Sequence, residues 1–198
     1  MITNEIIGLS GTNGAGKDTL ANVRQRANGI LTVGLSDILR RSLPDQNPTR
    51  EMLAAQSKRL RQALGNAALV DMALETYAIE KQTNGAAGLT VNGIRHPDEA
   101  RRIQTAGGVV IWVDAPVEIR YARIQAGRLS SGFSYDQVTL EDFKRQQEAE
   151  MTSTNTASVN LLATRDIANI RIENTFAIQG QYESYVADLL GVADSSPL

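Results

Sequence analysis

Residues 5–20 read Glu5-Ile6-Ile7-Gly8-Leu9-Ser10-Gly11-Thr12-Asn13-Gly14-Ala15-Gly16-Lys17-Asp18-Thr19-Leu20. The apolar run before Gly11 is typical of a buried β-strand, and the residues from Leu20 onward continue as a helix. Between them stands the pattern Gly-x4-Gly-Lys, whose glycines let backbone N–H groups turn inward at a helix N-terminus. Such a loop binds phosphate, and the lysine reaches the terminal phosphates. This stretch therefore predicts a strand, a phosphate-binding loop and a helix.

The residue after the lysine departs from the usual pattern, because Asp18 stands where Ser or Thr is common. A hydroxyl next to the lysine is normally the direct Mg²⁺ ligand. The hydroxyl follows one place later, so Thr19 is expected to contact phosphate and is the candidate metal ligand. The residues predicted to bind the nucleotide here are Gly11, Asn13, Gly14, Ala15, Gly16, Lys17, Asp18 and Thr19.

The rest of the chain alternates β-rich runs with helical stretches. The predicted strands cover residues 5–10, 30–34, 89–92, 109–114 and 169–173. This alternation indicates βαβ units and a parallel sheet, which is an α/β fold. The run Val109-Val110-Ile111-Trp112-Val113 is continuously apolar and predicts a central strand that helices cover on both faces.

Helix and loop signals divide the remaining sequence. Helices are expected to begin near Thr49, Pro97 and Pro116, and an amphipathic helix closes the chain through Leu190. The Gly- and Ser-rich stretch 128–135 predicts a loop and a short lid. We expect one domain over residues 1–191 and a flexible tail over residues 192–198.

Composition narrows the class of protein. The 198 residues include no Cys, which excludes disulfides, thiolate metal sites and thiol nucleophiles. A net charge of −2 does not favour nucleic-acid binding, and no apolar run approaches a membrane span. The N-terminal sequence lacks the pattern of a secretory signal, so a cytoplasmic protein with a small-molecule partner is expected, without nucleic acid or membrane.

Three further segments resemble one superfamily, the P-loop kinases that include adenylate kinase, deoxynucleoside monophosphate kinase and dephospho-CoA kinase. Ser36-Asp37-Ile38-Leu39-Arg40 resembles the segment under the acceptor nucleotide, and Asn92-Gly93-Ile94-Arg95 resembles an Asp-Gly-x-x-Arg turn with Asn in place of Asp. Arg120, Arg123 and Arg128 follow the fourth strand, where these kinases carry lid arginines. The Gly-Lys-Asp-Thr variant resembles phage-type deoxynucleoside monophosphate kinases.

The resemblance implies a three-layer α/β/α P-loop NTPase fold with five parallel strands in the order 2-3-1-4-5. It implies ATP as the donor, Mg²⁺ as the cofactor, an acceptor-binding helical region at about 36–83 and a lid at about 124–140. It also implies catalytic roles for Lys17, Arg123 and Arg128, acceptor binding by Asp37, Arg40 and Arg95, and base contact by Asn174. For Arg120, a structural role is the alternative to a catalytic one. For His96, a loop or capping role is the alternative to a functional one.

The acceptor itself stays open at this point. A nucleoside or deoxynucleoside monophosphate presents an oxyanion that is already a nucleophile, and the arginines favour it. Dephospho-CoA presents a ribose hydroxyl, for which a carboxylate such as Asp37 would serve as general base. A P-loop ATPase switch without a small-molecule acceptor is the alternative of another class, and either a monomer or a homodimer is compatible with the sequence.

Overall fold

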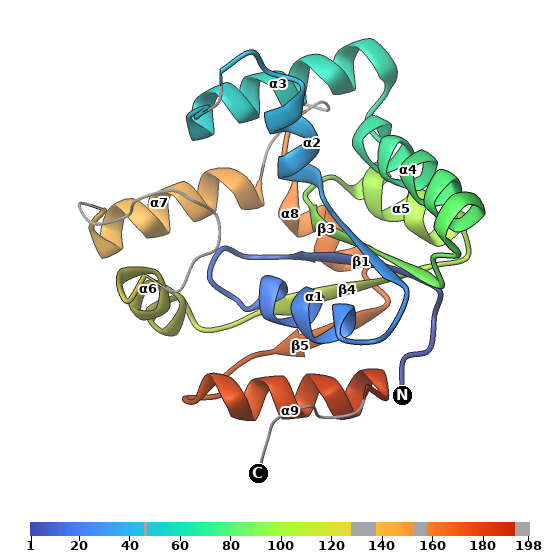
Figure 1. The fold of residues 1–198 in the computed structure, drawn as a ribbon. Coiled ribbons are helices and arrows are strands. Elements are labelled where there is room, and N and C mark those ends of the chain that lie inside the picture. The colour runs from blue at the N-terminus through green and yellow to red at the C-terminus, as the bar shows by residue number, and fades with distance from the viewer. Residues whose placement is uncertain (46, 128–137, 153–157, 193–198) are drawn as a thin grey trace.

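A parallel β-sheet lies at the centre of the computed structural model, which describes residues 1–45, 47–127, 138–152 and 158–192 (Figure 1). Its strands are β1 (Ile6–Gly11), β2 (Ile30–Gly34), β3 (Gly88–Ile94), β4 (Val109–Asp114) and β5 (Ile170–Glu173). They pair in the order β2-β3-β1-β4-β5. The predicted strands and their order are therefore confirmed, and the predicted bounds differ by at most two residues at either end.

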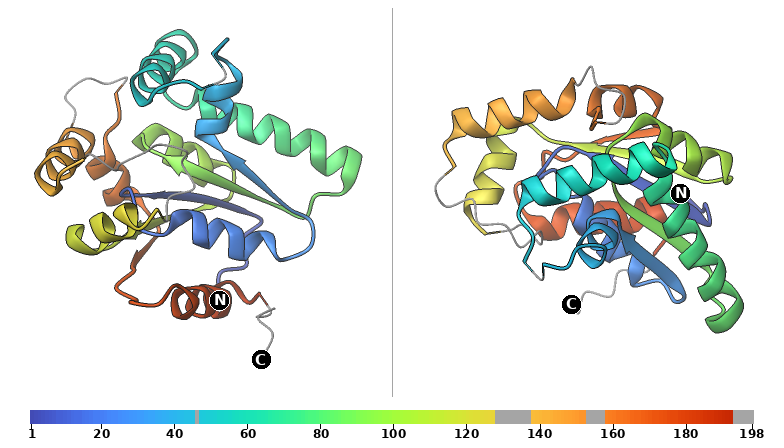
Figure 2. Two further views of the ribbon diagram at one scale, coloured as in Figure 1. Left: turned by 60° about the vertical axis from the view of Figure 1, so that its left-hand side comes forward. Right: turned by 90° about the horizontal axis from the view of Figure 1, so that it is seen from above.

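Helices cover both faces of the sheet, as Figures 1 and 2 show. One face carries α1 (Lys17–Gln25) and α9 (Gln179–Leu190), which pack on each other. The other face carries α4 (Ala68–Asn84), α5 (Pro97–Thr105) and α8 (Leu161–Ile167). The result is a three-layer α/β/α arrangement, as expected when parallel strands are joined by helical crossovers.

The remaining described helices gather near the carboxyl ends of the strands (Figure 2). They are α2 (Leu35–Arg41), α3 (Arg50–Leu64), α6 (Val117–Gln125) and α7 (Leu140–Met151). Thr49 caps α3 by accepting from the amide of Met52, and Pro97 is the first residue of α5, as the sequence predicts. Pro116 precedes α6 as its N-cap.

The side chains of β1 alternate between two apolar cores. Ile6 joins the core under α4 and α5, whereas Ile7 and Leu9 join the core under α1 and α9. All six residues of β1 are buried, because the strand has neighbours on both sides and helices on both faces. The loop that follows β1 is thus fixed to the most enclosed strand of the sheet.

A β-bulge interrupts the pairing of β1 with β3 close to where both strands end. Leu9 lies opposite Asn92, but Ser10 lies opposite Ile94, so Gly93 is the extra residue. Gly93 has a φ of +96°, which glycine adopts without strain. Bulges of this kind change the direction in which a neighbouring side chain points.

No helix of the described residues is long and apolar enough to cross a membrane.

Candidate active site

The loop between β1 and α1 has the shape that its glycines predict. Gly11 has a φ of +135°, and a Cβ atom there would lie 1.9 Å from the carbonyl oxygen of Val113. Gly16 has a φ of +107°, and its Cβ would lie 2.5 Å from Nδ2 of Asn174. Gly16 is also the N-cap of α1 and has no side chain to accept from the first amides of that helix. Those amides and the helix dipole are suited to an anion.

Lys17 begins α1 and bends back over the loop. Its Nζ donates to the carbonyl oxygens of Gly11 at 3.1 Å and Thr12 at 2.6 Å. Burial, and after it the nearby positive charge of Arg95, lower the pKa of Lys17 from 10.5 to about 8. The negative charges of Asp18 and Glu150 act in the opposite direction. An arriving phosphate would supply the negative charge that Lys17 lacks in the free protein.

Asn174 and Arg123 brace the far side of the loop. Asn174 is buried and donates from Nδ2 to the carbonyl oxygen of Ala15 at 2.8 Å. Arg123 donates to the carbonyl oxygens of Asn174 at 3.1 Å and Phe176 at 3.0 Å. Both residues line the main cavity. The two predicted site residues therefore lie together beside the loop, and Arg123 has backbone partners there.

Arg120 lies on the same helix but is almost fully buried. Its guanidinium donates to the carbonyl oxygens of Ala115 and Asn13 and to the side chain of Gln147, and it lies 3.6 Å from Asp114. Thr12 donates to the same Asp114 carboxylate at 2.5 Å. These contacts give Arg120 a structural role in holding the loop, which is the alternative that the sequence leaves open.

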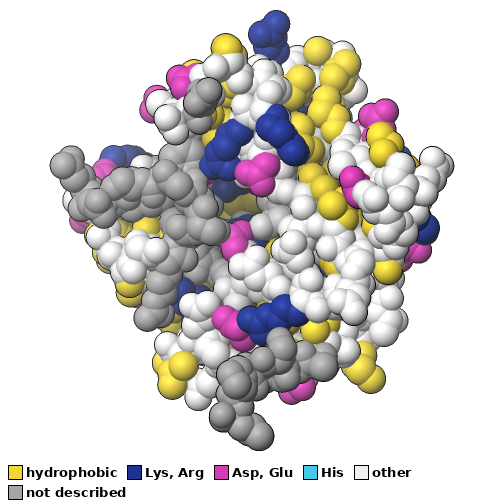
Figure 3. All heavy atoms as spheres, in the orientation of Figure 1, with side chains coloured by type: hydrophobic (Ala, Val, Ile, Leu, Met, Phe, Trp, Pro, Cys, Tyr) yellow, Lys and Arg dark blue, Asp and Glu magenta, His cyan; other side chains and the backbone are white. Residues whose placement is uncertain are grey.

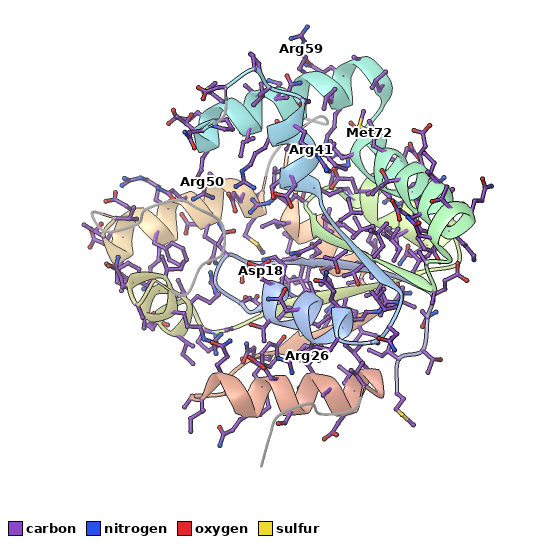
Figure 4. The ribbon with its side chains drawn as sticks, viewed as in Figure 1. Asp18, Arg26, Arg41, Arg50, Arg59 and Met72 are labelled. Carbon is purple, nitrogen blue, oxygen red and sulfur yellow. The ribbon has the colours of Figure 1, made fainter. Side chains whose placement is uncertain are left out.

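A cluster of opposite charges lies opposite the loop. Arg95, at the end of β3, donates to Oδ1 of Asn13 at 2.8 Å and pairs with Glu150 of α7 at 3.0 Å. Arg50, at the start of α3, pairs with the same Glu150 oxygen at 3.0 Å, and Figure 4 shows Arg50 between α3 and α7. Burial raises the pKa of the Glu150 carboxyl, but Arg95, Arg50 and Lys17 outweigh that effect and hold it below its usual range. Glu150 thus occupies a site that is built for an anion.

The segment of α2 that the sequence predicts to bind the acceptor divides into two groups of residues. Ser36, Leu39 and Arg40 line the cavity, whereas Asp37 is not among the lining residues. Asp37 pairs with Arg40 at 2.9 Å. In Figure 3, basic side chains with an acidic one among them gather over α2, beside a hollow in the surface.

One cavity of about 680 Å³ connects these groups. At one end lie the loop, Lys17 and Asn174, with Phe176 and Tyr182 beside them. At the other end lie apolar side chains of α2, α3 and α4, namely Leu35, Leu39, Leu53 and Leu69. Arg40, Arg50, Arg95 and Glu150 lie on its wall. The volume falls in the range of small-molecule sites and is large for a single phosphate.

Oxygen atoms suited to Mg²⁺ lie where α1 and β3 meet. Asp18, Thr19 and Asn92 all line the cavity, and Nδ2 of Asn92 donates to Oδ1 of Asp18 at 2.7 Å. The described residues contain no cluster of three or more His, Cys, Asp or Glu side chains that would enclose a metal ion. Mg²⁺ in phosphotransfer sites is usually held by one or two protein groups together with substrate phosphates, so this donor set fits.

Arg128 and most of the lid at 124–140 lie outside the described residues. His96 is buried and accepts from the amide of Asp98 at 3.1 Å, so it caps α5 together with Glu99. A capping role is one of the two alternatives that the sequence leaves open for His96.

Sequence reasoning missed several residues of the cavity. Arg50 is recognisable only as the first residue of a helix, and Glu150 is one of several acidic residues on α7 without a motif around it. Tyr182 and Phe176 follow Asn174 closely, and their aromatic character was the available signal.

Comparisons with known proteins identify distant sequence relatives and solved structures of similar fold. No protein-family model matches the chain. A UPF0200 protein of Sulfurisphaera tokodaii is 28% identical over 148 residues, which cover 74% of this chain and 77% of that protein. A UPF0200 protein of Thermococcus kodakarensis is also 28% identical, over 152 residues that cover 74% of this chain and 78% of that protein.

Among solved structures, TT1252 from Thermus thermophilus aligns with a TM-score of 0.56 and 20% identity, covering 96% of this chain and 99% of that one. The tunicamycin resistance protein of Deinococcus radiodurans aligns with a TM-score of 0.51 and 16% identity, covering 98% of this chain and 99% of that one. The fold is the P-loop NTPase fold. In a P-loop NTPase fold the carboxyl ends of the parallel strands form the ligand crevice, and the cavity lies there.

Proposed function

We propose that the chain is a P-loop phosphotransferase that moves the γ-phosphoryl group of ATP to a nucleoside or deoxynucleoside monophosphate. The observation that carries this proposal is the continuous cavity from the phosphate-binding loop, past an arginine cluster, to an apolar pocket. A pure nucleotide sensor needs only the first of these three parts. An enzyme that brings two substrates together needs all three.

The donor binds at the loop in this proposal. Inward-facing amides, the N-terminus of α1 and Lys17 provide positive potential for the β- and γ-phosphates. Asn174, Phe176 and Tyr182 line the adjoining part of the cavity and are suited to the sugar and base. Mg²⁺ bound with the nucleotide would offset phosphate charge, and Asp18, Thr19 and Asn92 are the residues able to hold it.

The acceptor binds between Arg95, Arg50 and Arg40 on one side and the leucines of α2, α3 and α4 on the other. Paired N–H groups of arginine suit a phosphate monoester, and apolar side chains suit the flat faces of a base. The helical region 36–83, which the sequence assigns to the acceptor, contributes most of this wall.

Transfer between two phosphates requires positioning and charge stabilisation more than covalent help. An acceptor phosphate oxygen is already a nucleophile, so this reaction needs no general base. Lys17 would stabilise charge on the transferred group, and Arg123 and Arg128 are proposed to assist from α6 and the lid. The backbone partners of Arg123 would keep its guanidinium at the loop.

One observation favours a second acceptor class. Glu150 brings a carboxylate into the cavity, next to Asn13 of the loop. An acceptor hydroxyl, as in dephospho-CoA, needs a group that takes its proton, and Glu150 is better placed for that than Asp37, which is not among the cavity-lining residues.

The experiment is a coupled ATP-to-ADP assay with Mg²⁺ against a panel of ribo- and deoxynucleoside monophosphates and dephospho-CoA. The proposal expects strong stimulation by one or a few monophosphates, with Lys17→Ala inactive but folded. Stimulation by dephospho-CoA alone would favour the hydroxyl acceptor. Turnover that no acceptor stimulates would instead indicate an ATPase switch and contradict the proposal.

A further inference from the structure

The carboxylate in the phosphate-binding loop is the most unusual feature of the site. Asp18 follows Lys17 directly, on the first turn of α1, where it faces the same cavity as the lysine. Figure 4 shows Asp18 at the start of that helix. A negative side chain beside bound phosphates is unfavourable unless a cation lies between them. The position of Asp18 therefore calls for a positive ion in the nucleotide complex.

Asn92 provides the second observation. The bulge at Gly93 follows Asn92 directly, and Nδ2 of Asn92 donates to Oδ1 of Asp18 at 2.7 Å. The other side-chain atom, Oδ1, is buried and accepts no hydrogen bond from any described residue. A buried acceptor without a partner is costly and rare in native structures. A carbonyl oxygen next to a carboxylate, in a cavity built for phosphates, is suited to a hard cation or to the water around one.

We propose that Asp18 and Asn92 together form the Mg²⁺ site of the nucleotide complex, with the carboxylate of Asp18 as its charged member. In the common arrangement, the loop supplies a neutral hydroxyl and the neighbouring strand supplies the carboxylate. Here the two chemistries are exchanged, because the loop carries Asp18 and the strand carries the neutral Asn92. The net charge is the same in both arrangements. This assignment rests on the proposed nucleotide binding and gives Thr19 a phosphate contact only.

The test measures metal affinity directly with Mn²⁺ as the probe, by electron paramagnetic resonance of free Mn²⁺ in the presence of saturating ADP. Asp18→Asn keeps the shape and removes the charge, and it is expected to weaken Mn²⁺ binding about tenfold or more. Adding Asn92→Asp to that variant returns a carboxylate on the strand and is expected to restore most of the affinity. Asp188→Asn, which removes the same charge from an exposed position of α9, is the matched control.

Calorimetric titration of ADP in EDTA separates this inference from the proposed function. If wild-type protein binds ADP neither in EDTA nor with Mg²⁺ present, the nucleotide site itself is wrong. If ADP binds but Asp18→Asn holds Mn²⁺ within twofold of wild type, the metal assignment is overturned. Weakening by Thr19→Val but not by Asp18→Asn would overturn it in favour of the hydroxyl. Thermal unfolding of each variant checks that the fold is intact.

Discussion

The protonation of Lys17 is expected to respond to an anion that binds at the loop. Its pKa of about 8 in the free protein results first from burial, and the ordinary value is 10.5. Bound phosphates stabilise the charged form and return the pKa toward that value. At a pH between about 8 and 10.5, nucleotide binding is therefore accompanied by protonation of Lys17. Nucleotide affinity is expected to fall as the pH rises above about 8. The stability of the fold depends on pH in the opposite direction. Lys17 binds its proton more tightly in the unfolded chain, so its contribution to the free energy of unfolding rises with pH across the same interval.

We therefore expect ADP binding at pH 8.5 to be accompanied by proton uptake. Calorimetric titrations in two buffers with different ionisation enthalpies measure this uptake directly. Lys17→Met should remove most of it and should flatten the pH dependence of affinity between pH 7.5 and 9. Equal uptake by wild type and variant would show that another group titrates.

At the scale of elements, Glu150 connects three segments that are far apart in the sequence. It lies on α7 and joins Arg50 of α3 to Arg95 at the end of β3. The three side chains are partly exposed, with 22–33% of each accessible. Solvent therefore weakens the pairs, and the carboxylate can be displaced by a phosphate at moderate cost. If the proposed acceptor site is correct, acceptor binding is therefore coupled to the position of α7.

Glu150→Gln is expected to strengthen binding of a phosphate-bearing acceptor, because it removes the negative charge that competes for both arginines. The expected change is roughly two- to fivefold, corresponding to about 0.5–1 kcal/mol. The measurement is the KM for the acceptor, or the inhibition constant of sulfate against it. Glu148→Gln, on the exposed side of the same helix, should change neither value. Weaker binding by Glu150→Gln would indicate that the carboxylate contacts the acceptor favourably.

At the scale of the whole molecule, a buried ion pair joins α3 to α5, next to the turn that follows β3. Glu99 accepts from Arg61 at 2.8 Å through one oxygen, and from the amides of Arg95 and His96 through the other. The side chains of Arg61 and Glu99 are only 3% and 0% exposed. The pair therefore fixes α3 relative to the turn that carries Arg95.

Glu99→Gln keeps an oxygen for the two amides but leaves the buried Arg61 without its counter-charge. We expect a loss of about 3–5 kcal/mol in the free energy of unfolding, measured by urea denaturation. Arg61→Met in the same background should recover part of this loss. Arg101→Gln breaks the exposed pair with Asp98 and should cost less than about 1 kcal/mol. If Glu99→Gln and Arg101→Gln lowered the free energy of unfolding by similar amounts, the distinction between buried and exposed pairs would be contradicted.

Local patterns were sufficient to predict the strands and the loop. An apolar run such as 109–113 indicates a buried strand, and the glycines of 11–16 indicate a tight loop, without information from distant residues. The same is true of the helix starts at Thr49 and Pro97. The charge cluster could not be predicted in this way. Arg50 and Glu150 are separated by 100 positions and meet only because α3 and α7 both lie over the carboxyl ends of the strands. Their pairing is a property of the tertiary arrangement and has no local signal.

The central place of β1 has a consequence for how the chain is made. This strand is synthesised first, but its partners β3 and β4 end only at Ile94 and Asp114. At roughly 5–20 residues per second, the ribosome needs about 5–20 s to reach them. During that interval the apolar segment 6–9 lacks both of the strands that pair with it in the folded protein. The segment that anchors the phosphate-binding loop is thus made long before the strands that enclose it, and exposed apolar segments of this kind favour aggregation.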